Sequence, residues 1–144
     1  MNEMINLHHS AAVHVPLALA FLFPLIHVLL LILIKTQLLP HRTWFLHIGV
    51  VVVQLVGAAL AYLTGQRDMV LSSAPTELLV EHQELAFWFM LIWLAVLCLL
   101  VLAVTLRNLK WSIFFHGALL VLLASQFYIA VRVGQIGGKL VFGI

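Results

Sequence analysis

Four long apolar stretches dominate the chain and limit what it can fold into. They cover about residues 11–34, 44–65, 83–106 and 111–133. At about 1.5 Å of rise per residue, a helix over any of them can cross a hydrocarbon core of about 30 Å. A helix is also favoured because it satisfies its own backbone hydrogen bonds in lipid. The sequence therefore predicts an all-α fold, an integral membrane four-helix up-down bundle that forms a single transmembrane domain over residues 1–144.

The composition excludes an ordinary soluble domain. Of the 144 residues, 65% are hydrophobic and 8% are charged, whereas soluble domains contain roughly 45–50% apolar residues. The four stretches use most of the chain and leave no room for a separate soluble domain. The sequence pI of about 9.0 comes from only seven Lys and Arg residues, spread singly along the chain. We therefore expect a lipid bilayer as partner, and no nucleic acid.

The positions of the basic residues predict the orientation. Lys35 and Arg42 follow the first apolar stretch, Arg107 and Lys110 follow the third, and neither connection contains an acid. All five acids lie elsewhere, at Glu3, Asp68, Glu77, Glu81 and Glu84. Because basic connections stay in the cytoplasm, both termini are expected on the extracytoplasmic side. The predicted location is the bacterial inner (cytoplasmic) membrane, as a multi-pass protein.

Two local patterns refine the predicted helices. Ser72, Ser73 and Pro75 suit the start of a helix, which predicts a middle loop over residues 66–74 and a third helix that begins near Pro75. In the second stretch Gly57, Ala61 and Gly65 recur every four residues. This stripe of small residues predicts the close approach of a neighbouring helix.

Eight histidines in so apolar a chain indicate a function, because polar side chains within a membrane usually face a partner, a cavity or a cofactor. In the predicted topology one group lies at the outer boundary: His8, His9, His14 and His82. His27, His47 and His116 lie within a turn or two of the inner boundary, about 10, 5 and 8 Å deep. These three are expected at one level, and His41 is expected in a loop.

Facing helices in an up-down bundle predict two transverse histidine pairs. His14 and His82 would form the outer pair, with His9 as a substitute, and His47 and His116 the inner pair. A porphyrin between two helices with one axial imidazole from each side suits such pairs. We therefore expect one or two haem b groups, with Arg132 available to an outer propionate and His27 as a substitute ligand or hydrogen-bond donor.

Helix geometry argues against His14 and His27 as ligands of two haem groups on one face of the first helix. At about 100° per residue, His14 and His27 differ by about 220° and do not share a face of a regular helix. His27 is equally compatible with an interhelical hydrogen bond, to a partner such as Gln54 or Gln126.

Three alternatives to a haem protein remain open. Glu81 and Glu84 flank His82, so His9, His14, His82 and Glu81 could hold zinc, copper or iron without porphyrin. A cofactor-free assembly or scaffold subunit would use its histidines for interhelical hydrogen bonds. Proton transport is favoured least, because no acid lies mid-membrane to form a relay with His27.

Short motifs in four parts of the chain resemble a known family. They are His9-Ser-Ala-Ala-Val-His14-Val-Pro16, Ala59-Leu-Ala-Tyr-Leu-Thr-Gly65, Glu81-His82-Gln-Glu84 and Gly137-Gly138-Lys-Leu140-Val141-Phe-Gly143. The chain is similar here to bacterial four-helix membrane proteins catalogued as domain of unknown function 2231. It departs in Ser10, where the family usually has Pro, and in Val15, where it prefers Phe. The resemblance implies a shared outer site formed by histidines and the glycine-rich tail.

These observations favour an electron carrier or complex subunit over a stand-alone enzyme. Some members of the family occur beside or fused to cytochrome c modules, which implies a redox context. The predicted function is a small b-type cytochrome that transfers electrons in a respiratory or redox chain. Its expected partners are a cytochrome c module, quinol or another redox membrane subunit, and a second copy of the chain is a further candidate.

Overall fold

The structure is a computed structural model that describes residues 2–70, 76–107 and 112–142, with side-chain surroundings for 13–67, 77–107 and 112–140. Its helices are α1 (Asn2–Lys35), α2 (Thr43–Val70), α3 (Thr76–Thr105) and α4 (Ser112–Phe142). Each contains a segment long and apolar enough to cross a membrane: Val13–Lys35, Thr43–Arg67, Glu77–Thr105 and Ser112–Leu140. The predicted all-α class and its four candidate spans are confirmed.

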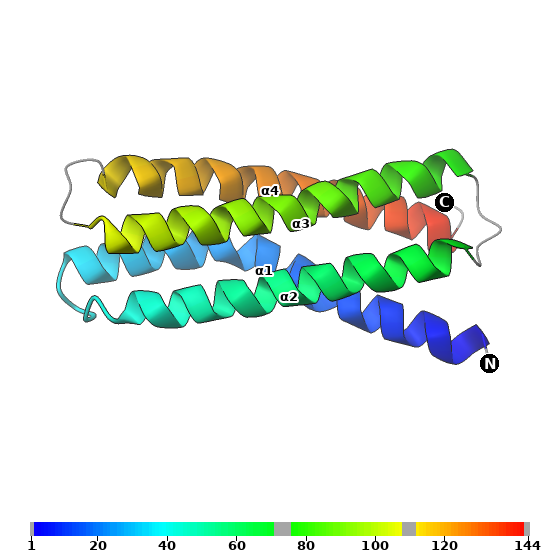
Figure 1. Ribbon diagram of the computed structural model, residues 1–144, viewed down its shortest axis with the longest axis horizontal. Helices are drawn as coiled ribbons and strands as arrows, with labels where there is room; N and C mark the ends of the chain where they lie inside the picture. Colours follow the sequence, from blue (N-terminus) through cyan, green and yellow to red (C-terminus); the bar gives the residue numbers. More distant parts are fainter. Residues whose placement is uncertain (1, 71–75, 108–111, 143–144) are drawn as a thin grey trace.

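The helices run side by side along one long axis (Figure 1). Each helix packs against its neighbours in chain order, and α4 also packs against α1. This arrangement places α1 diagonally across from α3, and α2 across from α4, as an up-down bundle requires. The start of α1 and the end of α4 lie at one end of the bundle, which we call the terminal end (Figure 1). The opposite end, with the α1–α2 connection, is the loop end.

Three helices extend further than the sequence predicts, and α1 does so at its start, which is Asn2 rather than about residue 11. α2 continues to Val70, so the expectation of a loop from residue 66 is wrong for residues 66–70. α4 continues through Gly137 and Gly138 to Phe142, so these glycines belong to a helix rather than to a tail beyond it. The apolar pattern marks where a span meets water, and a helix can continue past that point because its backbone hydrogen bonds do not depend on lipid. α3 begins at Thr76, and Pro75 lies outside the described residues.

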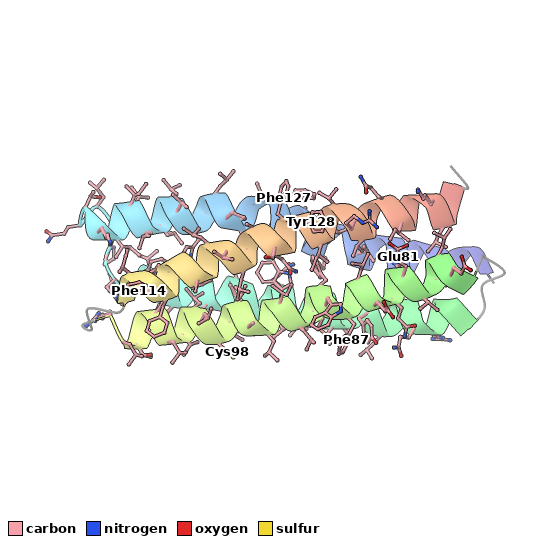
Figure 2. All side chains as sticks on the ribbon, turned by 90° about the horizontal axis from the view of Figure 1, so that it is seen from above. Glu81, Phe87, Cys98, Phe114, Phe127 and Tyr128 are labelled. Carbon is pink, nitrogen blue, oxygen red and sulfur yellow. The ribbon has the colours of Figure 1, made fainter. Side chains whose placement is uncertain are left out.

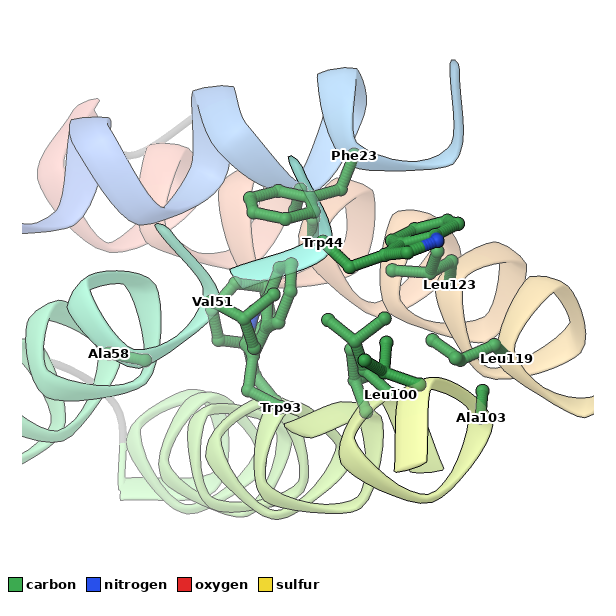
Figure 3. Packing of buried hydrophobic residues seen from close by; sticks show 14 residues of the cluster. Phe23, Trp44, Val51, Ala58, Trp93, Leu100, Ala103, Leu119 and Leu123 are labelled. Atoms are coloured by element: carbon green, nitrogen blue, oxygen red, sulfur yellow. The ribbon is translucent and has the colours of Figure 1, made fainter. Parts of the chain in front are cut away.

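The distribution of side chains suits a lipid environment. Large apolar side chains cover the outside, and Phe87, Phe114, Phe127 and Tyr128 are exposed (Figure 2). The interior contains a packed apolar cluster that includes Phe23, Trp93 and Leu100 (Figure 3). Buried polar side chains accompany that cluster, at His27, His47, Gln54, His116 and Gln126. Helix association in lipid depends on such packing and interhelical hydrogen bonds rather than on hydrophobic burial.

Two buried glutamines join neighbouring helices. Nε2 of Gln54 in α2 donates a hydrogen bond to the backbone carbonyl of Pro16 in α1, at 2.8 Å. Nε2 of Gln126 in α4 donates to the carbonyl of Phe89 in α3, at 3.0 Å. Gly57 lies next to the first contact, and a Cβ atom at that position would stand 3.4 Å from Cγ of Pro16. The small side chain therefore permits a close approach of α1, as its place in the small-residue stripe predicts.

Candidate functional site

Three histidines from three helices meet in the interior near the loop end. His27 in α1, His47 in α2 and His116 in α4 are 0%, 5% and 7% exposed. Nδ1 of His27 lies 3.4 Å from Nε2 of His47. Nε2 of His27 lies 3.2 Å from Nδ1 of His116. These three residues, here called the histidine triad, lie at one level, as their depths in the sequence indicate.

The ring nitrogens connect the three imidazoles in a fixed order. His27 uses its two nitrogens on two different neighbours, so the imidazoles form a chain from His47 through His27 to His116. A neutral imidazole carries one N–H donor and one acceptor nitrogen. All three rings can therefore be neutral with both hydrogen bonds satisfied, in either of two opposite tautomer sets. Among the described residues, His27 does not bond to Gln54 or Gln126, whose amides bind the backbone instead.

Aromatic side chains enclose the triad. The ring of Trp44, at the start of α2, has its centroid 5.2 to 5.8 Å from those of all three imidazoles. Phe23 lies one helical turn before His27 and packs against His47 at 5.3 Å. Phe23 also meets Trp93 edge-on, with centroids 4.8 Å apart. These aromatic neighbours lower the local dielectric around the hydrogen bonds between the rings.

A cavity of about 320 Å³ opens at the loop end of the triad. Its polar lining consists of Lys35, His41, Arg107, Ser112 and His116, and its apolar lining includes Trp44 and Leu31. His116 therefore belongs both to the triad and to the cavity wall. The pKa of His41 lies below the usual histidine value, because partial burial and the Arg107 charge both disfavour its protonated form.

Further buried polar atoms lie in the middle of the bundle. Oε1 of Gln54, Oε1 of Gln126 and Nε1 of Trp93 are buried and have no hydrogen-bond partner among the described residues. Gln54 follows His47 on α2 by seven residues, which is two helical turns or about 10 Å toward the terminal end. Buried polar atoms of this kind commonly bind ordered water. The interior thus offers two acceptors and one donor beyond the triad.

The residues predicted for an outer site occupy different surroundings. His14 is exposed, in agreement with the phase difference that separates it from the buried His27. His82 lies half-buried against α4, where a Cβ atom at Gly137 would stand 3.4 Å from its Cε1. Arg132 donates to Glu81 at 2.7 Å, so the predicted propionate partner and the predicted metal ligand form an ion pair. The side chains of His8 and His9 lie outside the described residues.

The triad does not hold a single metal ion in the geometry described. Within the described ranges, no three His, Cys, Asp or Glu side chains are placed to bind one metal. His27 turns opposite nitrogens to its two neighbours, so one ion cannot touch all three rings. In the predicted inner haem pair, His47 and His116, the ring of His27 lies between the two imidazoles. The separations of 3.2 and 3.4 Å are those of hydrogen bonds.

Sequence reasoning did not identify two parts of this site. The bridging place of His27 depends on the rotation of α1, which an apolar stretch does not reveal. The second part is Trp44, whose ring lies beside all three imidazoles. Its position three residues before His47 does place both side chains on one face of α2, and this spacing was the available signal.

No family model, curated protein or solved structure matches the chain. The resemblance to domain of unknown function 2231 therefore stays a prediction.

Proposed function

We propose that the chain is a multi-pass membrane protein that transfers protons through the histidine triad. The observation that supports this most strongly is the use of opposite nitrogens of His27 on His47 and His116. A histidine that accepts a proton on one nitrogen and releases one from the other can act as a proton shuttle. The relay needs no mid-membrane acid, because its three members are imidazoles.

The transfer balances without a co-reactant. A proton added to Nδ1 of His47 releases the proton on Nε2 of that ring to Nδ1 of His27. His27 then passes its Nε2 proton to Nδ1 of His116, and His116 releases one from its own Nε2. One proton enters, one leaves, and every ring has changed tautomer. The rings return to the first set by rotation, which allows a second proton to move in the same direction.

The surroundings offer the relay a route to water at His116 and sites for water farther along the bundle. His116 lines the cavity at the loop end, which gives that end of the relay a route to water. Toward the terminal end, the free polar atoms of Gln54, Trp93 and Gln126 can bind water within the bundle. A hydrated layer there would connect the triad with the outer half of the protein.

The orientation is part of the proposal. Lys35, Arg42 and Arg107 lie at the loop end, and the connections there contain no acid, which supports a cytoplasmic loop end and extracytoplasmic termini in a bacterial inner membrane. Single cysteines introduced at Thr36 and Glu77 in a Cys98→Ser background would test this. A membrane-impermeant thiol reagent added outside intact cells should label position 77 and not position 36, and the reverse pattern would contradict the orientation.

Proton flux into vesicles tests the proposed function. Purified protein is reconstituted in liposomes that contain a trapped pH dye, and a potassium diffusion potential drives proton entry. Wild-type protein should carry flux well above that of empty vesicles, and His27→Gln should lose it. Glutamine can keep hydrogen bonds to both neighbours but cannot exchange a proton between two ring nitrogens.

The matched control is His14→Gln, the same change on the same helix at an exposed position. It should keep the wild-type flux. Equal flux from wild-type protein and His27→Gln, with both at the same density in the vesicles, would reject the relay.

A small b-type cytochrome is the second candidate. One observation favours it: His47 and His116 come from the diagonal helices α2 and α4 and lie at one level. Haem b would there supply one-electron chemistry, and His27 would have to leave its place between the two neighbours. A dithionite-reduced minus oxidised spectrum of protein expressed with ample haem distinguishes the two. A b-type α band that His47→Ala removes would support the cytochrome.

A further inference from the structure

Several cationic groups gather around the cavity at the loop end. Lys35 at the end of α1, His41 in the connection, and Arg107 after α3 come from three different segments. All three are cationic or can become so. No carboxylate is among the residues that line the cavity, and the sequence has no acid in residues 35–43 or 105–112. The described lining therefore contains no anion to balance these groups.

The cationic groups act on one another. Arg107 lies near enough to His41 to disfavour its protonated form. Lys35 and His41 are both near enough to His116 to interact with it electrostatically. Like charges held around a partly enclosed space repel, and an anion between them would remove that repulsion.

The start of α4 contributes a second and independent feature. Ser112, the first residue of α4, lines the same cavity. The N-terminus of a helix of 31 residues carries unpaired backbone N–H groups and the positive end of the helix dipole. Helix N-termini beside cationic side chains bind phosphate and carboxylate groups.

We propose that this cavity binds a phosphate oxyanion. Arg107 supplies a planar fork of N–H donors, Lys35 a point charge, and Ser112 a hydroxyl and the helix end. A cavity of about 320 Å³ is large enough for a phosphate group with part of an ester substituent. The phosphate comes from free inorganic phosphate or from the headgroup of an anionic lipid in the cytoplasmic leaflet. This inference does not depend on proton transfer through the triad.

Calorimetric titration in a neutral detergent tests the site and separates the two sources. The first arm titrates the full chain with sodium phosphate, with ionic strength held constant by chloride. The second arm titrates it with short-chain phosphatidylglycerol and, for comparison, short-chain phosphatidylcholine. Saturable binding of phosphate assigns the free anion, and binding of phosphatidylglycerol tighter than phosphatidylcholine assigns the headgroup. The proposal is overturned when phosphate does not bind and phosphatidylglycerol binds no tighter than phosphatidylcholine.

Variants show whether the cavity is responsible. Arg107→Gln should weaken binding by about tenfold or more, because it removes a charge-assisted contact. Arg107→Lys keeps the charge but loses the fork of donors, so it should weaken binding less than Arg107→Gln does. Arg42→Gln is the matched control, because Arg42 is an exposed arginine at the same end that does not line the cavity. If Arg42→Gln and Arg107→Gln weaken binding equally, with helix content unchanged by circular dichroism, the site is only a general basic surface and the proposal fails.

Discussion

Nε2 of His27 lies 3.2 Å from Nδ1 of His116, although 89 positions separate the two residues in the chain. The contact joins α1 to α4, which are the first and last helices of the chain. The other nitrogen of His27 faces His47 in α2, so one fully buried side chain links three of the four helices. Any substitution of His27 therefore affects both the packing of the bundle and the proposed path of protons.

Removal of the His27 ring should destabilise the bundle. His27→Ala leaves a cavity and also leaves Nε2 of His47 and Nδ1 of His116 without their partner. Both effects together predict a loss of about 2–4 kcal/mol in the free energy of unfolding. Denaturant unfolding in detergent, followed by circular dichroism, measures this. His14→Ala changes an exposed histidine and should stay within about 0.5 kcal/mol of the wild type. Equal losses in both variants would show that the triad does not stabilise the bundle.

The two glutamine contacts should each contribute modestly to the free energy of unfolding. Gln54→Leu removes the hydrogen bond to Pro16, and Gln126→Leu removes the one to Phe89. Interhelical hydrogen bonds in membrane proteins contribute about 0.6 kcal/mol on average and up to about 1.7 kcal/mol. Each variant also removes a buried Oε1 that has no described partner, so the net loss should be below about 1.5 kcal/mol. A loss of several kcal/mol would indicate that these oxygens have partners that the described residues do not include.

Gly57 and Gly49 offer a matched pair on α2. A side chain at Gly57 would meet Pro16, whereas a Cβ at Gly49 has no heavy atom within 4 Å. Gly57→Leu should force α1 away from α2 and reduce the free energy of unfolding by about 1–3 kcal/mol. Gly49→Leu should be neutral or stabilising, because leucine has the higher helix propensity. Thermal unfolding of the two variants beside the wild type compares them, and a larger loss for Gly49→Leu would contradict the packing described.

The protonation of His41 should respond to Arg107. Its pKa is lowered from the usual value of 6.5 by partial burial and by the Arg107 charge, while Lys35 and His116 also face the cavity. The folded protein thus binds this proton more weakly than the unfolded chain, so the His41 contribution to stability falls as the pH drops below about 6.5. Arg107→Gln should raise the pKa of His41, as measured by NMR titration of its ring protons. An unchanged pKa would show that the Arg107 charge does not affect the protonation of His41.

The Glu81–Arg132 ion pair should contribute little to stability. Its side chains are 45% and 43% exposed, so solvent screens the 2.7 Å contact. Glu81→Gln should change the free energy of unfolding by at most about 1 kcal/mol, and less at high salt. The double exchange Glu81→Arg with Arg132→Glu should restore the wild-type value. Loss of a bound metal from Glu81→Gln, seen by elemental analysis, would instead favour the role of Glu81 as a ligand.

The sequence predicts the helices well because their signal is local. Each apolar stretch is long enough to identify a helix by itself, and the depths of His27, His47 and His116 within these stretches indicate their shared level. The rotation of each helix about its axis is not local, because it depends on packing against neighbours. The bridging position of His27 and the pairing of Arg132 with Glu81 follow from that rotation. A residue count along one helix gives depth and phase, but it does not say which neighbour a side chain meets.

The central claim is that His27 shares a proton with each of its two neighbours, and ¹⁵N NMR of histidine-labelled protein in lipid tests it most directly. Scalar coupling between nitrogens across a hydrogen bond identifies the two partners. The account predicts coupling of Nε2 of His27 to Nδ1 of His116, and of Nδ1 of His27 to Nε2 of His47, in neutral rings that exchange between two tautomer sets. The absence of both couplings, or ring nitrogen shifts that show ligation of these histidines to a metal, would contradict the relay.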